Sequence, residues 1–237
     1  MELSKKEVKI TKGIAILFML LLHLFCTKIY EGLFTPSIFI GNTPLIYYFA
    51  LFGDCCVAIY CFCSGYGLFL SYENNNTNYN KNNRVRILKL YINTWIVLFL
   101  FIIVLGSITK NSSIYPINIK EFFLTVTLVN PAYNGAWWFL TTYILLVVLS
   151  SSINKIVKKY NVIVIIFISF IIYFMAYIQR IKGVLNFDNV ILEYMVRQLS
   201  LLGTSLFPYI VGSVFAYKKI YSKVYTVVNK FKYKNII

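Results

Sequence analysis

The stretch KGIAILFMLLLH at residues 12–23 opens the first long apolar run of the chain, which continues to residue 30. It carries one basic residue at its start and contains the chain's single histidine. About 20 apolar residues in a helix cross the hydrocarbon core of a bilayer. We therefore predict that residues 13–30 form a membrane span.

The same pattern recurs along the chain. Hydrophobic residues make up 59% of the sequence and charged residues 13%, against about 45–50% and about 25% in an average soluble domain. Two shorter stretches, 43–52 and 120–130, predict interfacial or re-entrant helices that lead into the next span. We predict an all-α fold, a polytopic transmembrane bundle in a single domain over residues 1–237, whose further spans cover 53–72, 87–106, 136–152, 162–179 and 199–217. A cleaved signal peptide is not expected, because similar apolar runs follow the first.

The net charge of +15 has a topological explanation rather than a nucleic-acid one. Most of the 23 Lys and Arg residues lie before the first span, in the 73–86 and 153–161 connections, and after the last span. Cytoplasmic connections carry such an excess. We predict a multi-pass protein of the plasma (inner) membrane with both ends cytoplasmic. The cations left on the opposite side are Lys28, Lys110, Lys120, Arg180, Lys182 and Arg197.

The five cysteines do not form a metal-binding pattern. Cys55, Cys56, Cys61 and Cys63 crowd into one apolar run, and no second cluster accompanies them. Zinc ligands come as spaced pairs with further Cys or His. We predict no metal and interpret these cysteines as small lipid-buried side chains.

His23 is the first candidate for chemistry, because a polar group inside a membrane span is costly. Lys12 lies eleven residues earlier, and eleven steps of ~100° bring both side chains to one helix face. Placed within 13–30, the imidazole is expected near the middle of the bilayer. It could form a structural hydrogen bond between helices, or act as a general base.

The second candidate region is Ser64-Gly65-Tyr66-Gly67, followed by the basic residues Arg84, Arg86 and Lys89. The glycines allow close helix packing or close approach to a ligand. The basic trio could serve as a topology signal or as a phosphate-binding site. Asp54, which opens the second span, could cap that helix, pair with a cation, or orient an imidazole across the bundle, and capping is the favoured interpretation.

Two other segments carry a distinctive composition, one rich in asparagine and one rich in aromatic residues. The Asn-rich residues 74–83 are expected to form a flexible solvated loop. Trp138 belongs to Gly-Ala-Trp-Trp-Phe-Leu at 135–140, which could be an interfacial aromatic belt or the wall of a donor or acceptor cavity.

In order, these pieces resemble the membrane-bound acyltransferase-3 family, which includes bacterial O-acetyltransferases of surface polysaccharides. The resemblance rests on the basic residue, ten-residue gap and histidine of 12–23, the aromatic run 57–67 ending in Ser-Gly-Tyr, the basic entry 84–91, and Trp-Phe-Leu at 138–140. It covers about residues 8–145.

The resemblance implies an O-acyltransferase. An acyl-CoA donor, acetyl-CoA above all, would bind from the cytoplasm, and a glycan or lipid-linked sugar would accept the acyl group. His23 would be the catalytic residue, as a general base or proton relay that helps the sugar hydroxyl attack the thioester or assists passage of the acyl group across the bilayer. The implied substrate-binding residues are Lys12, Arg84, Arg86, Lys89, Ser64, Gly65 and Trp138.

The chain departs from the family pattern in two ways. Family members usually have about ten helices, against the six predicted here, and a proline common after the basic entry to the third helix is absent from residues 91–95. A shortened family member, catalytically silent or dependent on a partner or a second copy, is the alternative expectation. A transporter is disfavoured, because we find no inverted repeat.

Overall fold

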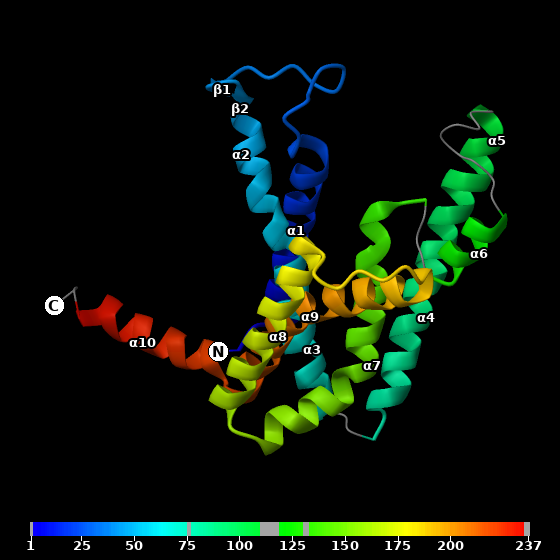
Figure 1. Ribbon diagram of the computed structural model, residues 1–237. Helices are drawn as coiled ribbons and strands as arrows, with labels where there is room; N and C mark the ends of the chain where they lie inside the picture. Colours follow the sequence, from blue (N-terminus) through cyan, green and yellow to red (C-terminus); the bar gives the residue numbers. More distant parts are fainter. Residues whose placement is uncertain (1, 75–76, 110–118, 130–132, 235–237) are drawn as a thin grey trace.

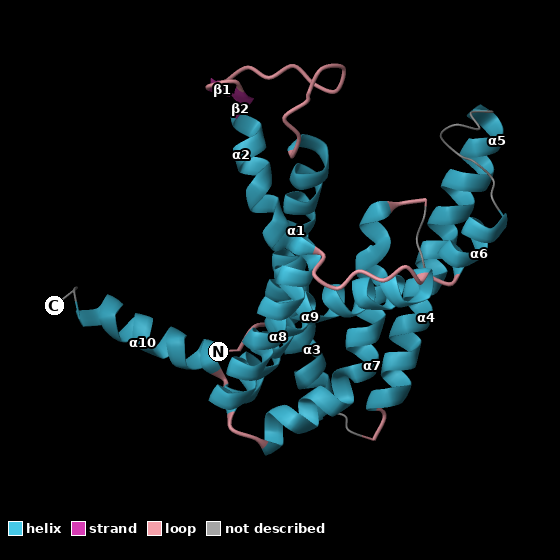
Figure 2. Cartoon of the chain, viewed as in Figure 1, coloured by secondary structure: helices cyan, strands magenta, loops and turns pink. Residues whose placement is uncertain are grey.

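A computed structural model describes residues 2–74, 77–109, 119–129 and 133–234. It is almost entirely helical (Figure 2), as predicted. Within the described residues, six helical segments are long and apolar enough to cross a membrane. They are Lys5–Phe25, Leu45–Asn74, Tyr79–Leu105, Gly135–Lys159, Val162–Lys182 and Val190–Lys218.

The first hairpin of the bundle pairs α1 (Lys5–Phe25) with α2 (Leu45–Leu51), the 3-10 turn η1 (Phe52–Asp54) and α3 (Cys55–Asn74). The latter three run on as one helical segment (Figure 1). The short helix predicted at 43–52 corresponds to α2 and the start of η1, and it leads directly into the next span. Asp54 is exposed inside this segment, so its interpretation as the cap of a new helix is wrong.

The remaining elements follow in chain order. A two-stranded antiparallel pair, β1 (Phe39–Ile40) and β2 (Thr43–Pro44), lies in the α1–α2 connection and was not predicted. The short helix predicted at 120–130 is α6 (Ile119–Val126), which ends earlier than predicted because residues 127–129 form a turn. Asn130 and Lys110 lie outside the described residues. The other elements are α4 (Tyr79–Leu98), the π-helical turn η2 (Phe99–Leu105), α5 (Gly106–Thr109), α6 (Ile119–Val126), the 3-10 turn η3 (Gly135–Trp137), α7 (Trp138–Lys159), α8 (Val162–Lys182), α9 (Val190–Lys218) and α10 (Ile220–Lys234).

The centre of the molecule is the crossing of α3 with α9, flanked by α1, α7 and α8 (Figure 1). The backbones approach so closely that a Cβ on Gly65 would lie 1.9 Å from the Tyr209 carbonyl oxygen. A Cβ on Gly212 would lie 2.1 Å from the Phe62 carbonyl oxygen. Small residues allow such contact between membrane helices. The outward side of α8, in contrast, exposes Ile163, Phe167 and Phe174 to what would be lipid.

Gly212→Ala is expected to destabilise this crossing. The new methyl would press on the α3 backbone, and overpacking of this kind costs about 3 kcal/mol at the upper end of its usual range. The thermal unfolding midpoint in detergent should fall. Gly67→Ala is the matched control, since nothing lies within 4 Å of its Cβ position. Equal midpoints for both variants would contradict the close crossing.

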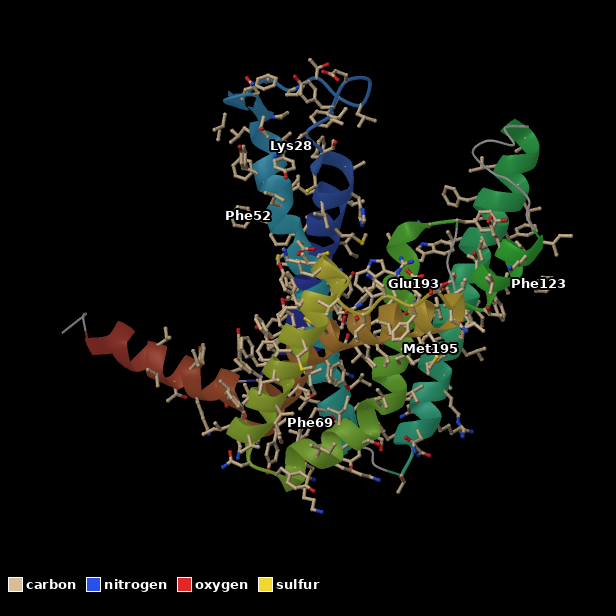
Figure 3. The ribbon with its side chains drawn as sticks, in the orientation of Figure 1. Lys28, Phe52, Phe69, Phe123, Glu193 and Met195 are labelled. Atoms are coloured by element: carbon tan, nitrogen blue, oxygen red, sulfur yellow. The ribbon has the colours of Figure 1, made fainter. Side chains whose placement is uncertain are left out.

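The ends of the helices separate into two sides. The chain begins close to the point where α9 passes into α10, and the α3–α4 and α7–α8 connections lie on this same side of the bundle (Figure 1). Lys28, labelled in Figure 3, lies far from it, at the end of α1. The connections predicted to be cytoplasmic therefore share one side of the fold.

Candidate functional site

Helix α1 starts eight residues earlier than residue 13. A capping box fixes its start: Ser4 Oγ accepts a hydrogen bond from the Glu7 amide (3.2 Å), and Glu7 Oε2 accepts one from the Ser4 amide (2.6 Å). The basic residues before the apolar run are thus helical. Lys5, Lys9 and Lys12 follow i, i+4, i+7 spacing and share one face.

Helix α4 also starts early, inside the Asn-rich segment, and corrects the prediction of a flexible loop over 74–83. Residues 75–76 of that segment lie outside the described part of the chain, but Tyr79 and Asn83 are helical and buried. Tyr79 donates a hydrogen bond to Ser150 Oγ of α7 (2.7 Å), and Asn83 Nδ2 donates to the same oxygen (3.1 Å). Arg86 Nη1 donates to Asn83 Oδ1 (2.6 Å). A buried polar network therefore orients the Arg86 guanidinium.

The first turns of α1 and of α4 each form one wall of a groove of about 690 Å³ between α1, α3 and α4. Lys12 and Arg86 are half-buried in it, and Lys5 and Lys9 are exposed beside them. Four cations and no carboxylate are among the described lining residues of the groove. The other lining residues are Leu3, Val8, Tyr66, Gly67, Leu70, Ser71, Asn74 and Asn82.

Glu2, beside the lining residues Leu3 and Tyr66 of the groove, joins three parts of the chain. The Tyr66 hydroxyl of α3 donates a hydrogen bond to Glu2 Oε2 (2.7 Å) and accepts one from the Leu3 amide (3.1 Å). Ser222 of α10 donates to Glu2 Oε1 (2.8 Å). Partial burial alone would raise the pKa of Glu2, but these hydrogen bonds to its carboxylate outweigh burial and lower the pKa below its usual 4.5.

The lowered pKa of Glu2 predicts a pH-dependent attachment of α10. A carboxyl whose folded pKa is depressed stabilises the fold above its unfolded pKa and loses that contribution as pH falls through the folded value. At pH 7, amide hydrogen exchange in the first turn of α10 should be slower in the wild type than in Glu2→Ala. Compared pH by pH, this difference should shrink as pH falls below 4.5. A difference that stays constant with pH would contradict the assignment.

The structure separates the other predicted residues from the groove. Ser64 donates to the Tyr60 carbonyl of its own helix (2.7 Å), and Gly65 packs against α9. Arg84 and Lys89 are exposed and do not line the groove. Of the residues predicted from the sequence to bind substrate, Lys12 and Arg86 are brought together.

His23 lies in the last turn of α1, because the helix ends at Phe25 rather than at residue 30. The expected mid-bilayer depth, taken from the run 13–30, therefore shifts toward the end of the helix away from Lys5. The side chain is exposed, and no hydrogen bond links it to the described part of the chain. Eleven residues place it ~16 Å along the helix from Lys12. Among the described residues, the interhelical hydrogen bond considered above is not formed.

Trp138 lines a different cavity, of about 580 Å³, where α7 begins, α8 ends and α9 begins. Arg180 stands over its ring, with the guanidinium carbon 5.5 Å from the ring centroid. Trp138 is thus the wall of a cavity, on the other side of the bundle from the groove.

The sequence analysis did not identify Lys5, Lys9 or Asn83 as site residues, whereas Tyr66 belonged to its second candidate region. The Ser-x-x-Glu signature at 4–7 was the available signal for the two lysines, since it marks a helix start. Asn83 had no such signal, because its role depends on Ser150 of another helix.

Within the described residues the protein is a six-span helical bundle with a cationic groove on one side and an arginine-lined cavity on the other. The family model of the acyltransferase domain of acyltransferase-3 proteins matches residues 5–224. The chain belongs to this acyltransferase-3 family, whose activity is acyl transfer and implies an acyl donor. Neither a curated protein nor a solved structure matches the chain.

Proposed function

We propose that the protein is an O-acyltransferase of the plasma membrane. It moves an acyl group, acetyl above all, from acyl-CoA to a hydroxyl of a cell-surface polysaccharide or lipid-linked sugar. The observation that carries the proposal is the cationic groove of Lys5, Lys9, Lys12 and Arg86. Family membership supplies the reaction class.

The groove suits the phosphates of a CoA thioester. An arginine held in place by Asn83 offers paired N–H donors to phosphate oxygens, and a lysine offers a point charge. Phosphates would relieve the repulsion between Lys12 and Arg86, which lie within electrostatic range of each other. Leu3, Val8 and Leu70 supply apolar wall for the less polar parts of the donor.

Charge distribution supports entry of the donor from the cytoplasm. The groove opens beside the N-terminal residues, and the Lys- and Arg-rich connections gather on that side of the bundle (Figure 1). Positive connections remain cytoplasmic during insertion. Both chain ends then face the cytoplasm, where acyl-CoA is available.

His23 fits the role of general base for the acceptor. Its neutral imidazole would take the proton of the acceptor hydroxyl as that oxygen attacks the thioester carbonyl. The new C–O bond replaces the C–S bond, and the departing CoA thiolate takes up a proton. The thioester would have to reach ~16 Å along α1 from the phosphate site.

One observation favours a version of this function that depends on a partner. His23 is exposed, and an imidazole facing lipid without a partner is costly. A second copy of the chain or another membrane protein would cover this side of α1. Crosslinking in membranes through the exposed end of α1 would report such a neighbour.

The direct test is transfer of radiolabelled acetyl from acetyl-CoA in inverted membrane vesicles containing the protein, with matched vesicles lacking it. Label should enter the glycan or lipid-linked sugar fraction only when the protein is present. Label that stays in acetyl-CoA, with the protein correctly inserted and native acceptor supplied, would overturn the proposed function.

Asn83→Ala is expected to weaken donor binding without touching the donor. Loss of the 2.6 Å bond to Arg86 frees the guanidinium, and loss of one hydrogen bond to a charged group costs about 1.5–3 kcal/mol. We expect the KM for acetyl-CoA to rise by roughly tenfold, with little change in kcat. Asn80→Ala, at an exposed position on the same helix, is the control. An unchanged KM in Asn83→Ala would refute the positioning role.

A further inference from the structure

The cavity beside Trp138 has both apolar and polar walls and carries two arginines. Arg180 and Arg197 line it together with one acid, Glu193, which is labelled in Figure 3. Neutral polar side chains from α8, α9 and their connection complete its polar lining, namely Gln179, Asn186, Tyr194 and Ser200. The cavity therefore offers a small surplus of positive charge within a set of hydrogen-bonding groups.

These arginines stand on the side of the protein where cations are scarce. The start of α7, the end of α8 and the start of α9 all lie opposite the connections that hold most of the Lys and Arg residues. Orientation in the membrane selects against Lys and Arg in short connections on that side. With Glu193 as the one acid among the described lining residues, the two arginines leave a net positive charge in the cavity, which an anionic ligand would balance.

The cavity is pre-organised. Arg180 Nη1 donates to Thr204 Oγ1 of α9 (3.2 Å), and its guanidinium covers the Trp138 ring. The Gln179 side chain makes two bonds to Leu185, donating to its carbonyl and accepting its amide, each at 2.8 Å. Gly183 ends α8 with φ +56°, a conformation that L side chains rarely adopt. The connection is thus folded back onto the cavity before any ligand arrives.

We propose that this cavity binds an oxyanion, carboxylate or phosphate, carried by the sugar acceptor. This rests on the proposed function, which requires an acceptor on the side opposite the donor groove. Arg197 and the free edge of Arg180 pair with the oxyanion. Glu193 and Asn186 take hydrogen bonds from sugar hydroxyls. An acidic or phosphorylated glycan is therefore the preferred acceptor over a neutral one.

Sugar binding to the purified protein without any acyl donor tests this directly. In phosphatidylcholine nanodiscs at constant ionic strength, glucuronate and glucose 6-phosphate should quench intrinsic tryptophan fluorescence, with a Kd at least about tenfold below that of glucose. Arg197→Gln should remove this preference, and Trp138→Phe should remove most of the quenching. Lys182→Gln is the matched control, because it removes a charge on the same side without lining the cavity.

The outcomes separate this proposal from the proposed function. Equal Kd values for neutral and acidic sugars would overturn the anionic site even where acetyl transfer is observed. If Lys182→Gln reduced the preference for acidic sugars as much as Arg197→Gln, the preference would come from general surface charge and the site would be overturned. Quenching by phosphatidylglycerol nanodiscs alone, without sugar, would assign the cavity to a lipid headgroup and overturn the acceptor role. An acidic preference in binding without any acetyl transfer would uphold the site while the proposed function failed.

Discussion

In the acetyl-transfer assay, Arg86→Gln is expected to raise the KM for acetyl-CoA by about 10- to 100-fold. Arg86 is the half-buried cation of the groove whose geometry is fixed by Asn83, and a charge-assisted pair with a phosphate contributes about 1.5–3 kcal/mol. Because the interaction is made in the ground state as well as in the transition state, kcat should change little.

Lys89→Gln is the matched control for Arg86→Gln. Lys89 lies one turn further along α4, is exposed, and does not line the groove. It removes the same charge from the same helix and should leave KM close to the wild-type value. If both variants raise KM equally, the donor responds to the overall charge of α4 rather than to the groove.

The complementary prediction concerns His23. Its replacement in His23→Ala should lower kcat by about 10²- to 10⁴-fold, the usual contribution of a general base, while the KM for acetyl-CoA changes little. The donor site should survive, since Lys12 lies three helical turns away and α1 is capped independently at Ser4.

Membrane abundance and donor affinity must be measured alongside kcat for this variant. Cys26→Ala, at the position that follows α1, controls for disturbance of the helix end. Transfer by His23→Ala at the wild-type rate would return the histidine to a non-catalytic role, such as contact with a neighbouring subunit.

Hydropathy predicted the spans well, because a helix that faces lipid needs an apolar sequence of its own, whatever its neighbours are. The six predicted runs correspond to the six long apolar helices. The boundaries were less accurate, since they depend on local hydrogen bonds. The capping box of Ser4 and Glu7 extended α1 into the basic N-terminal segment, and the chain left the helix at Cys26.

The site was harder to predict, because it is assembled from residues whose partners are distant in sequence. Composition indicated a solvated loop around Asn83, yet the Asn83 side chain is buried against α7, where it donates a hydrogen bond to Ser150. Gly65 was a candidate for ligand contact, but the α9 backbone occupies the space in front of it. Only the fold shows that Lys12 and Arg86 face one groove while Arg84 and Lys89 do not.

The most direct test of the account is calorimetric titration of the purified protein with CoA, which needs neither acceptor nor turnover. We predict saturable binding to the wild type and to Lys89→Gln, and loss of binding in the double variant Lys12→Gln/Arg86→Gln. Binding of CoA to the double variant with wild-type affinity, or no binding to the correctly folded wild type, would contradict the assignment of the groove as the donor site.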